Sequence, residues 1–199
     1  VHPFGGAPAL TTTGYWVGQD MARSLALNAD GSSGYVLDLS GGLHPVGGAG
    51  RVSGGPYWLG RDIARDVVLT PDSTASRPAG YVLDGYGAIH AFGAAPRLQW
   101  SAKWPGQDIA NAFTLQPDGL GGYVLDGYGG LHRFGNATAV TGGPYWSGWD
   151  IARGVASLDA GRGYVLDGYG GIHPYGGAPP TESPPKWGVD VARSLSLAR

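Results

Sequence analysis

The sequence predicts an all-β protein, a β-propeller of about five blades with three to four short antiparallel strands in each blade. Three observations lead to this prediction: a repeat of about 42 residues, period-two alternation inside each repeat, and turn residues at fixed places. The stretch GYVLDGYGGLHRFG (122–135) recurs in similar form from residues 34, 80 and 163, and the truncated copy VHPFG opens the chain. No window has the 3.6-residue periodicity of a convincing amphipathic helix.

The length and register of the repeat follow from the positions of the histidines, tryptophans and aspartates. The five histidines, His2, His44, His90, His132 and His173, lie 42, 46, 42 and 41 residues apart. A tryptophan follows each histidine after 14 residues: Trp16, Trp58, Trp104, Trp146 and Trp187. An aspartate follows each tryptophan after four residues, or three in the last copy: Asp20, Asp62, Asp108, Asp150 and Asp190. The register divides one repeat domain, 1–199, into repeats of about 1–43, 44–89, 90–131, 132–172 and 173–199, the last of them incomplete.

Each repeat is expected to contain a β-hairpin. In YVLD the side chains alternate as in a strand, the following GYG or SGG is typical of tight turns, and the segment from Gly to Phe around each histidine alternates again. A further strand is expected before YVLD, in SLAL (24–27), VVL (67–69), AFTL (112–115) and SLSL (194–197). A four-stranded blade would take its edge strand from the stretch between His and Trp.

Composition excludes several classes of partner. The 38 glycines fall mostly at fixed places in the repeat, so they indicate turns, and fourteen Asp against one Glu favour strands and turns over helices. A net charge of −2 without a basic face argues against nucleic acid, and no apolar run approaches the roughly 20 residues needed for membrane insertion. The absence of cysteine excludes disulfides and thiolate metal sites. We expect no cofactor and no metal.

The two ends of the chain suggest a piece of a longer array. There are five copies of the His–Trp–Asp segment but four of GYVLD. A closed ring would join residues 194–197 to residues 1–6 in a blade without its middle strand. We therefore expect a chain cut from a longer repeat protein.

The repeat signature GYVLDGYGGxHxFG, followed by WxGxDIAR, resembles the glycine-rich propeller repeats of secreted actinobacterial proteins over essentially the whole chain. It differs from a WD40 repeat, because Trp and Asp are not adjacent at a strand end apart from Trp149–Asp150. Five-bladed propellers of similar repeat length include tachylectin-like lectins, whose sites recur once per blade. The resemblance implies an extracellular or cell-surface location and, at the level of fold, repeated ligand sites.

The hairpin-tip tyrosines Tyr86, Tyr128 and Tyr169 are the first candidates for ligand binding. A turn flanked by glycines exposes its side chain, and an aromatic ring at the same place on several blades would form a stacking platform. Alternatively, each ring folds over the neighbouring blade. Ser40 breaks the series in the first hairpin.

The five tryptophans named above are the second candidates. Each ring would stack on the C–H face of a pyranose while the nearby aspartate accepts hydrogen bonds from hydroxyls. The alternative, favoured because every repeat has the same packing problem, is that Trp fills the space between blades while Asp and Arg fix the turn. Asn111 replaces this Arg in the third repeat. The histidines are expected to pack in an aromatic layer with the Phe or Tyr two residues on, since their spacing matches no metal motif.

The sequence therefore predicts a non-catalytic extracellular binding module whose partner is a glycan or a cell-surface polymer. The alternative is a structural or adhesive scaffold that self-associates or is attached to a larger host protein. A third alternative, a glycoside hydrolase, needs paired carboxylates that do not recur, and the unrepeated acids Asp66 and Glu182 show no pairing. Departures from the repeat, namely the long loop 72–79 and the extra Trp100 and Trp149, single out the second to fourth repeats.

Overall fold

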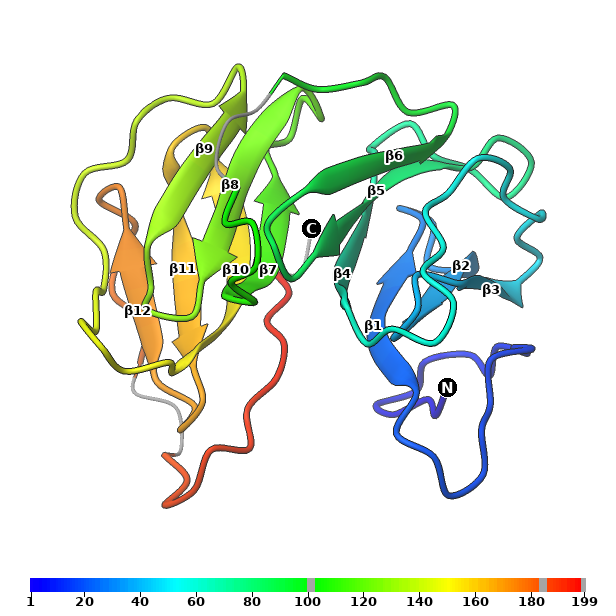
Figure 1. The fold of residues 1–199 in the computed structure, drawn as a ribbon, viewed down its shortest axis with the longest axis horizontal. Helices are drawn as coiled ribbons and strands as arrows, with labels where there is room; N and C mark the ends of the chain where they lie inside the picture. Colours follow the sequence, from blue (N-terminus) through cyan, green and yellow to red (C-terminus); the bar gives the residue numbers. More distant parts are fainter. Residues whose placement is uncertain (100–102, 183–185, 198–199) are drawn as a thin grey trace. The chain divides into compact units, whose positions relative to one another are not determined.

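The computed structural model describes residues 1–99, 103–182 and 186–197. Within these ranges the chain forms twelve β-strands and no helix. The strands are grouped in four three-stranded antiparallel sheets, each a meander in chain order (Figure 1). The predicted all-β class is confirmed. Each sheet takes its first two strands from one repeat and its third strand from the beginning of the next repeat.

The strand bounds follow the repeat. The first sheet contains β1 (Ala22–Leu27), β2 (Ser33–Asp38) and β3 (Leu43–Gly47), and the second contains β4 (Ala64–Leu69), β5 (Ala79–Asp84) and β6 (Ile89–Gly93). The third sheet contains β7 (Ala110–Leu115), β8 (Gly121–Asp126) and β9 (Leu131–Gly135), and the fourth contains β10 (Ala152–Asp159), β11 (Arg162–Asp167) and β12 (Ile172–Tyr175).

The predicted hairpins are confirmed. Each YVLD segment forms the middle strand of its sheet, and in the third sheet Val124 pairs with His132 and Leu125 with Leu131. The turn between them needs a glycine at 129, where φ is 92°. The stretches expected to precede YVLD lie inside β1, β4 and β7.

One strand prediction was wrong, and one strand was missed. Residues 194–197 form no strand, although they pass close to β10, where a Cβ on Gly154 would lie 3.0 Å from the Leu195 nitrogen. A strand needs a hydrogen-bonded neighbour, and this segment has none in the described part of the chain. The stretch between His and Trp, the possible fourth strand, forms one bridge, between Thr12 and Val46, within the described residues. In each of four repeats a carbonyl of this stretch also accepts the N–H of the glycine that ends the third strand or follows it, as Thr11 does from Gly47 at 2.8 Å. In the fourth repeat β10 is a strand for which no stretch had been predicted.

The chain divides into two compact units. One consists of Val1–Asp84 and Ala88–Arg97, and the other of Gly85–Gly87 and Leu98–Arg199. The first contains β1–β6 and the second β7–β12. Inside each compact unit the first strands of the two sheets, β1 with β4 and β7 with β10, lie side by side (Figure 1).

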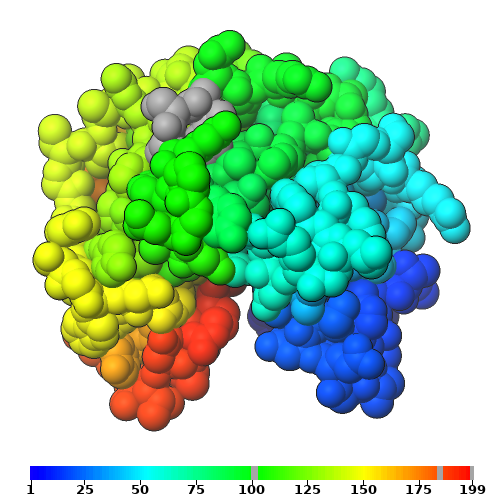
Figure 2. Space-filling model, viewed as in Figure 1, coloured from blue at the N-terminus to red at the C-terminus, as the bar shows by residue number. Residues whose placement is uncertain are grey.

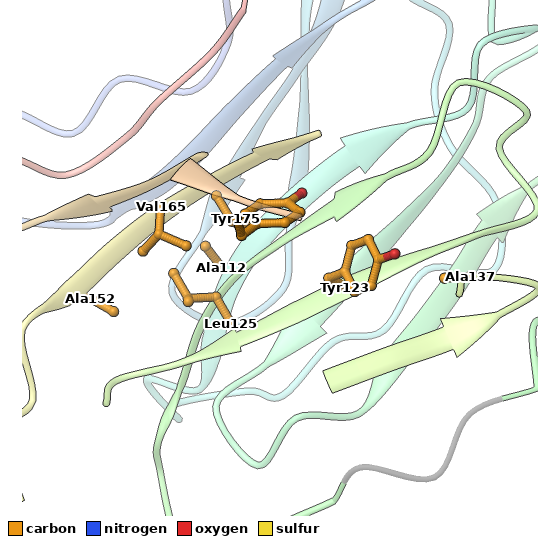
Figure 3. Close-up of a cluster of buried hydrophobic side chains, with 8 residues drawn as sticks. Ala112, Tyr123, Leu125, Ala137, Ala152, Val165 and Tyr175 are labelled. Atoms are coloured by element: carbon orange, nitrogen blue, oxygen red, sulfur yellow. The ribbon is translucent and has the colours of Figure 1, made fainter. Parts of the chain in front are cut away.

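The core of the second compact unit lies between its two sheets (Figure 3). Tyr123 and Leu125 of β8 pack against Ala152, Val165 and Tyr175 of the next sheet, and the two tyrosine ring centroids are 5.8 Å apart. Leu125 is fully buried, which stabilises the fold by about 1.5–3 kcal/mol. One face of a sheet, carrying the Tyr and Leu of YVLD, thus packs on the opposite face of the following sheet.

The first compact unit repeats this arrangement. Leu37 of β2 packs with Val67, Val82 and Phe92 of the next sheet, and the Tyr35 and Phe92 rings lie 6.0 Å apart. The hydroxyl of each YVLD tyrosine donates to a backbone carbonyl 15 residues further on, as Tyr35 does to Gly50 at 2.6 Å. The middle strands are therefore covered on both faces without an unsatisfied phenol.

The glycine before each YVLD is not a turn residue. A Cβ on Gly122 would overlap the Thr114 carbonyl oxygen of β7 and lie 2.9 Å from the Phe134 ring of β9. The corresponding Cβ on Gly34, Gly80 or Gly163 would also meet the carbonyl of its neighbouring strand. These glycines let backbone and ring approach closely inside the sheet, so the interpretation of the glycines as turn residues was wrong for these four.

Candidate functional site

Four of the repeat tryptophans are packed edge-on against histidine rings. The pairs are Trp16–His44, Trp58–His90, Trp104–His132 and Trp146–His173, with centroids 4.7–5.0 Å apart and interplanar angles of 78–88°. The partner is the histidine of the next repeat, not the one 14 residues upstream. Trp58 also covers the preceding hairpin, since a Cβ on Gly41 would lie 2.8 Å from its ring. Each of these rings is half-buried, which leaves little of it for a ligand.

The fifth tryptophan differs from the others. Trp187 is exposed, and no histidine ring pairs with it among the described residues. His2 is also exposed. The remaining histidines contact tryptophan rings and carboxylates, so the predicted ring layer with the Phe or Tyr two residues on was wrong. The sheet brings a more distant tryptophan against the imidazole instead.

The aspartate of each YVLD segment completes these histidine contacts and was not predicted as a site residue from the sequence. In the third sheet Asp126 Oδ2 lies 2.8 Å from His132 Nε2, and Oδ1 accepts the backbone N–H groups of Tyr128 and Gly130 at 2.9 and 2.8 Å. An ionised carboxylate only accepts, so the ring nitrogen is the donor. We call this arrangement the Asp–His clamp. It recurs in Asp38–His44, Asp84–His90 and Asp167–His173.

The clamp is a structural element of the hairpin. Asp126 uses one carboxylate oxygen for the turn and the other for the imidazole, whose ring in turn meets Trp104. Four equivalent copies with their hydrogen bonds made within the hairpin do not resemble a single reactive centre. The signal that could have found it is the constant six-residue spacing from the Asp of YVLD to the His. In the part of the chain that the structure describes, no three His, Asp or Glu side chains gather to hold a metal.

The hairpin-tip tyrosines are held by their backbone on both sides. The Tyr128 N–H donates to Asp126, and its carbonyl accepts the Trp146 N–H at 2.7 Å. The carbonyls of Tyr86 and Tyr169 likewise accept from the next tryptophan, each at 2.9 Å. All three side chains are half-buried, because the following segment folds over the tip. The flanking glycines therefore expose these rings less than the sequence suggests.

The most exposed tyrosine rings of the repeat are the ones directly before tryptophan. Tyr15, Tyr57 and Tyr145 are 69%, 62% and 66% exposed. Lys103 holds the equivalent place in the third repeat and Lys186 in the fifth. The recurring Tyr-Trp pair in the sequence is the signal that could have identified these rings. These tyrosines form a set of equivalent aromatic rings that the packing of the fold does not use.

Arginine–aspartate links connect neighbouring repeats. Arg23 donates to both carboxylate oxygens of Asp62, at 3.1 and 2.7 Å, and Arg65 donates to the same carboxylate at 3.0 Å. In the fourth repeat Arg153 binds Asp190 in the same forked way, at 3.2 and 2.6 Å. Among the described residues the Asp20 side chain accepts only from its own Arg23, and Asp108 is exposed.

These links predict a loss of stability in acid. The hydrogen bonds from Arg23 hold the pKa of Asp62 below its usual value, and those from Arg153 do the same for Asp190. A carboxyl with a lowered folded-state pKa contributes stability that is complete above its unfolded pKa, about 3.9, and is lost as pH falls through the folded pKa. We expect the urea midpoint to fall below about pH 4, and to fall less in an R23Q/R153Q double variant. An equal fall in both proteins would contradict the assignment.

The departures from the repeat are spread over the chain. Trp149 is half-exposed beside Tyr169, whereas Trp100 lies outside the described residues. Asp66 accepts a hydrogen bond from Ser24, and Glu182 is exposed in its loop. In the long loop 72–79 Arg77 pairs with Asp72.

No protein-family model, curated protein or solved structure matches this chain. A search of the described residues for a helix long and apolar enough to cross a bilayer finds none. The fold and the candidate site define an all-β repeat protein in which equivalent exposed aromatic rings recur on separate sheets. The functional assignment therefore depends on the chemistry of these rings and their neighbours.

Proposed function

We propose that the chain is a non-catalytic carbohydrate-binding module that acts outside the cell or at its surface and holds its ligand at several equivalent sites. The observation that carries the proposal is the recurrence of an exposed aromatic ring at Tyr15, Tyr57 and Tyr145. Burying such rings on a partner gives a large contact area at low entropic cost, because a tyrosine has only two side-chain torsions. The resemblance to repeats of secreted propellers and to tachylectin-like lectins favours the same assignment.

Carbohydrate fits the chemistry around these rings. A tyrosine ring can stack on the C–H face of a pyranose, and the following turn carries polar acceptors such as Asp62, whose side chain is half-exposed. Each site is small and open, so a single contact would be weak. Several such sites on one chain would raise the overall affinity for a polymer by the effective concentration of the second contact.

We propose further that the repeats form a β-propeller of about five blades. In both compact units the Tyr and Leu face of one sheet packs on the following sheet, and the first strands lie side by side. The last repeat contributes a segment that passes β10 near Gly154. Repetition of one sheet-to-sheet contact is the arrangement that radial repetition of blades needs.

The hydrogen bonds and ion pairs of the carboxylates support the proposed lack of catalysis. The buried carboxylates are tied to turn amides and histidines in the clamps, as in Asp126. The exposed carboxylates Asp62 and Asp190 bind arginines. A glycosidase needs an acid and a second carboxylate free to act on opposite sides of one bond.

A screen of the purified protein on a glycan array tests the proposal. We expect the wild type to bind, and a Y15S/Y57S/Y145S variant to lose at least about tenfold in apparent affinity, because three stacking rings are removed at once. The matched comparison is Y86A/Y128A/Y169A, which changes the half-buried rings at the hairpin tips. A larger loss in the second variant would place the site at the tips. No binding of the wild type to any glycan would reject the proposal.

A second candidate, an assembly scaffold, is favoured by uncovered apolar surface on the first sheet. Leu25 of β1 is 46% exposed, whereas Val67 and Val155 at the equivalent places of β4 and β10 are 3% and 6% exposed. A cavity of about 430 Å³ lies beside it, lined in part by Trp16 and Val36. A negative glycan screen would leave this candidate ahead.

A further inference from the structure

One position of the repeat carries a ring that no other repeat has. The residue before the aspartate of the Trp-x-Gly-x-Asp turn is polar in three repeats, Gln19, Arg61 and Gln107, and is Trp149 in the fourth. Its side chain is 51% exposed. The segment around residue 150, yellow in Figure 2, lies at the surface of the molecule. A large ring that replaces a polar residue at a surface turn is not required by the packing of the fold.

Trp149 is nevertheless held in place. Its ring centroid lies 6.0 Å from that of Tyr169, at an angle of 55°, and its backbone N–H donates to the Trp146 carbonyl at 3.0 Å. The half-buried Tyr169 is itself fixed at its hairpin tip, through its N–H to Asp167 and its carbonyl to Trp187. The indole is therefore supported on one side and open to solvent on the rest. A ring ordered before binding loses little entropy when a ligand stacks on it.

The adjacent carboxylate differs from those of Asp62 and Asp190. Asp150 Oδ1 accepts from Arg153 Nη1 at 2.8 Å and from Asn111 Nδ2 at 3.2 Å. Its Oδ2 accepts from none of the described residues. In Asp62 and Asp190, Oδ2 binds an arginine Nη2 at 2.7 and 2.6 Å.

The cause of this difference is Asn111, which replaces the arginine of the other repeats and presents a single amide nitrogen instead of a fork. The Asp150 side chain is 58% exposed, so solvent reaches the carboxylate. One acceptor oxygen is thereby left for a ligand, in the residue next to an open indole.

We propose that Trp149 and Asp150 form the main sugar-binding subsite of this chain, an assignment that rests on the proposed carbohydrate-binding function. The indole stacks on the C–H face of a pyranose, and Asp150 Oδ2 accepts from one or two of its hydroxyls. Trp149 and Asp150 are consecutive residues, with Cα atoms about 3.8 Å apart, and both side chains are more than half exposed, so both groups are open to one oligosaccharide. The ligand is a neutral pyranose, because Asp150 would repel an acidic sugar.

An array of immobilised neutral oligosaccharides of glucose, galactose, mannose and N-acetylglucosamine tests the subsite. The variant Trp149→Gln restores the residue of the first and third repeats, so it is expected to fold as the wild type does. We expect it to bind about tenfold more weakly or worse, as for the loss of a central aromatic contact. Trp149→Tyr should recover most of the binding, and Asp150→Asn should weaken it. Arg61→Gln, the same place in the second repeat, is the matched control and should bind normally.

The outcomes distinguish failure of the Trp149–Asp150 subsite from failure of the proposed carbohydrate-binding function. Wild-type binding that Trp149→Gln leaves unchanged would overturn the subsite and leave carbohydrate binding standing, with Tyr15, Tyr57 and Tyr145 as its rings. A wild type that binds no sugar would overturn both. Wild-type binding to glycoproteins that free oligosaccharide does not displace would mean that Trp149 contacts polypeptide, and would also overturn the subsite.

Discussion

Replacement of Gly122 by alanine is expected to destabilise the protein by about 3 kcal/mol or more, because the new methyl group meets backbone that cannot move away. Its Cβ would overlap the Thr114 carbonyl oxygen and lie 2.9 Å from Phe134 Cζ. Relief requires β7 and β9 to separate from β8 on both sides, which opens a sheet whose middle strand is fully buried. Urea unfolding followed by tryptophan fluorescence measures the change.

Gly48 provides the control for this substitution. No heavy atom lies within 4 Å of a Cβ at this position, and its φ is not in the left-handed region. Gly48→Ala should therefore change the free energy of unfolding by no more than about 0.5 kcal/mol. Equal unfolding midpoints for Gly122→Ala and Gly48→Ala would show that the sheet tolerates the methyl group and that the close approach is not required.

Removal of one Asp–His clamp is expected to cost a similar amount. In Asp126→Ala the N–H groups of Tyr128 and Gly130 and the Nε2 of His132 lose their acceptor in a part-buried turn. Leaving such donors unsatisfied costs about 2–4 kcal/mol in total. The Trp104 ring would also lose an oriented partner, since it contacts His132 edge-on. Chemical denaturation should show the shift.

Two further variants serve as controls for Asp126→Ala. Asp126→Asn keeps one oxygen for the turn amides and should recover much of the stability. Asp20→Ala removes a carboxylate that is 95% exposed and should stay within about 0.5 kcal/mol of the wild type. If Asp126→Ala behaved as Asp20→Ala does, the clamp would contribute nothing measurable, and another contact would have to hold the hairpin.

Local pattern was enough to predict the hairpins. The alternation in YVLD, the turn glycines and the second alternating segment each involve residues near in sequence, and they correspond to β2–β3, β5–β6, β8–β9 and β11–β12. The strand predicted at 194–197 does not form, because it would depend on a neighbouring strand from elsewhere in the chain. Alternation shows that a segment can be a strand, but a strand forms only where a neighbour supplies its hydrogen bonds.

Which rings contact each other, and which rings remain exposed, could not be predicted in the same way. The histidines were expected to pack with the Phe or Tyr two residues on, yet His132 meets Trp104, 28 residues earlier in the chain. Likewise the exposed rings are those of Tyr15, Tyr57 and Tyr145, while the glycine-flanked rings at the tips are partly covered. Which ring is covered depends on where the segment after each hairpin passes over the hairpin tip. The sequence of a single repeat does not show that position.

The sequence by itself determined the all-β class, the repeat length and the hairpin in each repeat, because these depend on side-chain alternation and turn chemistry within about 15 residues. The tertiary structure decided the contacts that cross from one repeat to the next. Trp58 lies between two hairpins, Arg23 reaches Asp62, and Asn111 leaves an oxygen of Asp150 without a donor from the described residues. These contacts depend on the packing of one sheet on another, which brings together residues about 30–40 positions apart and fixes which groups remain open to a ligand.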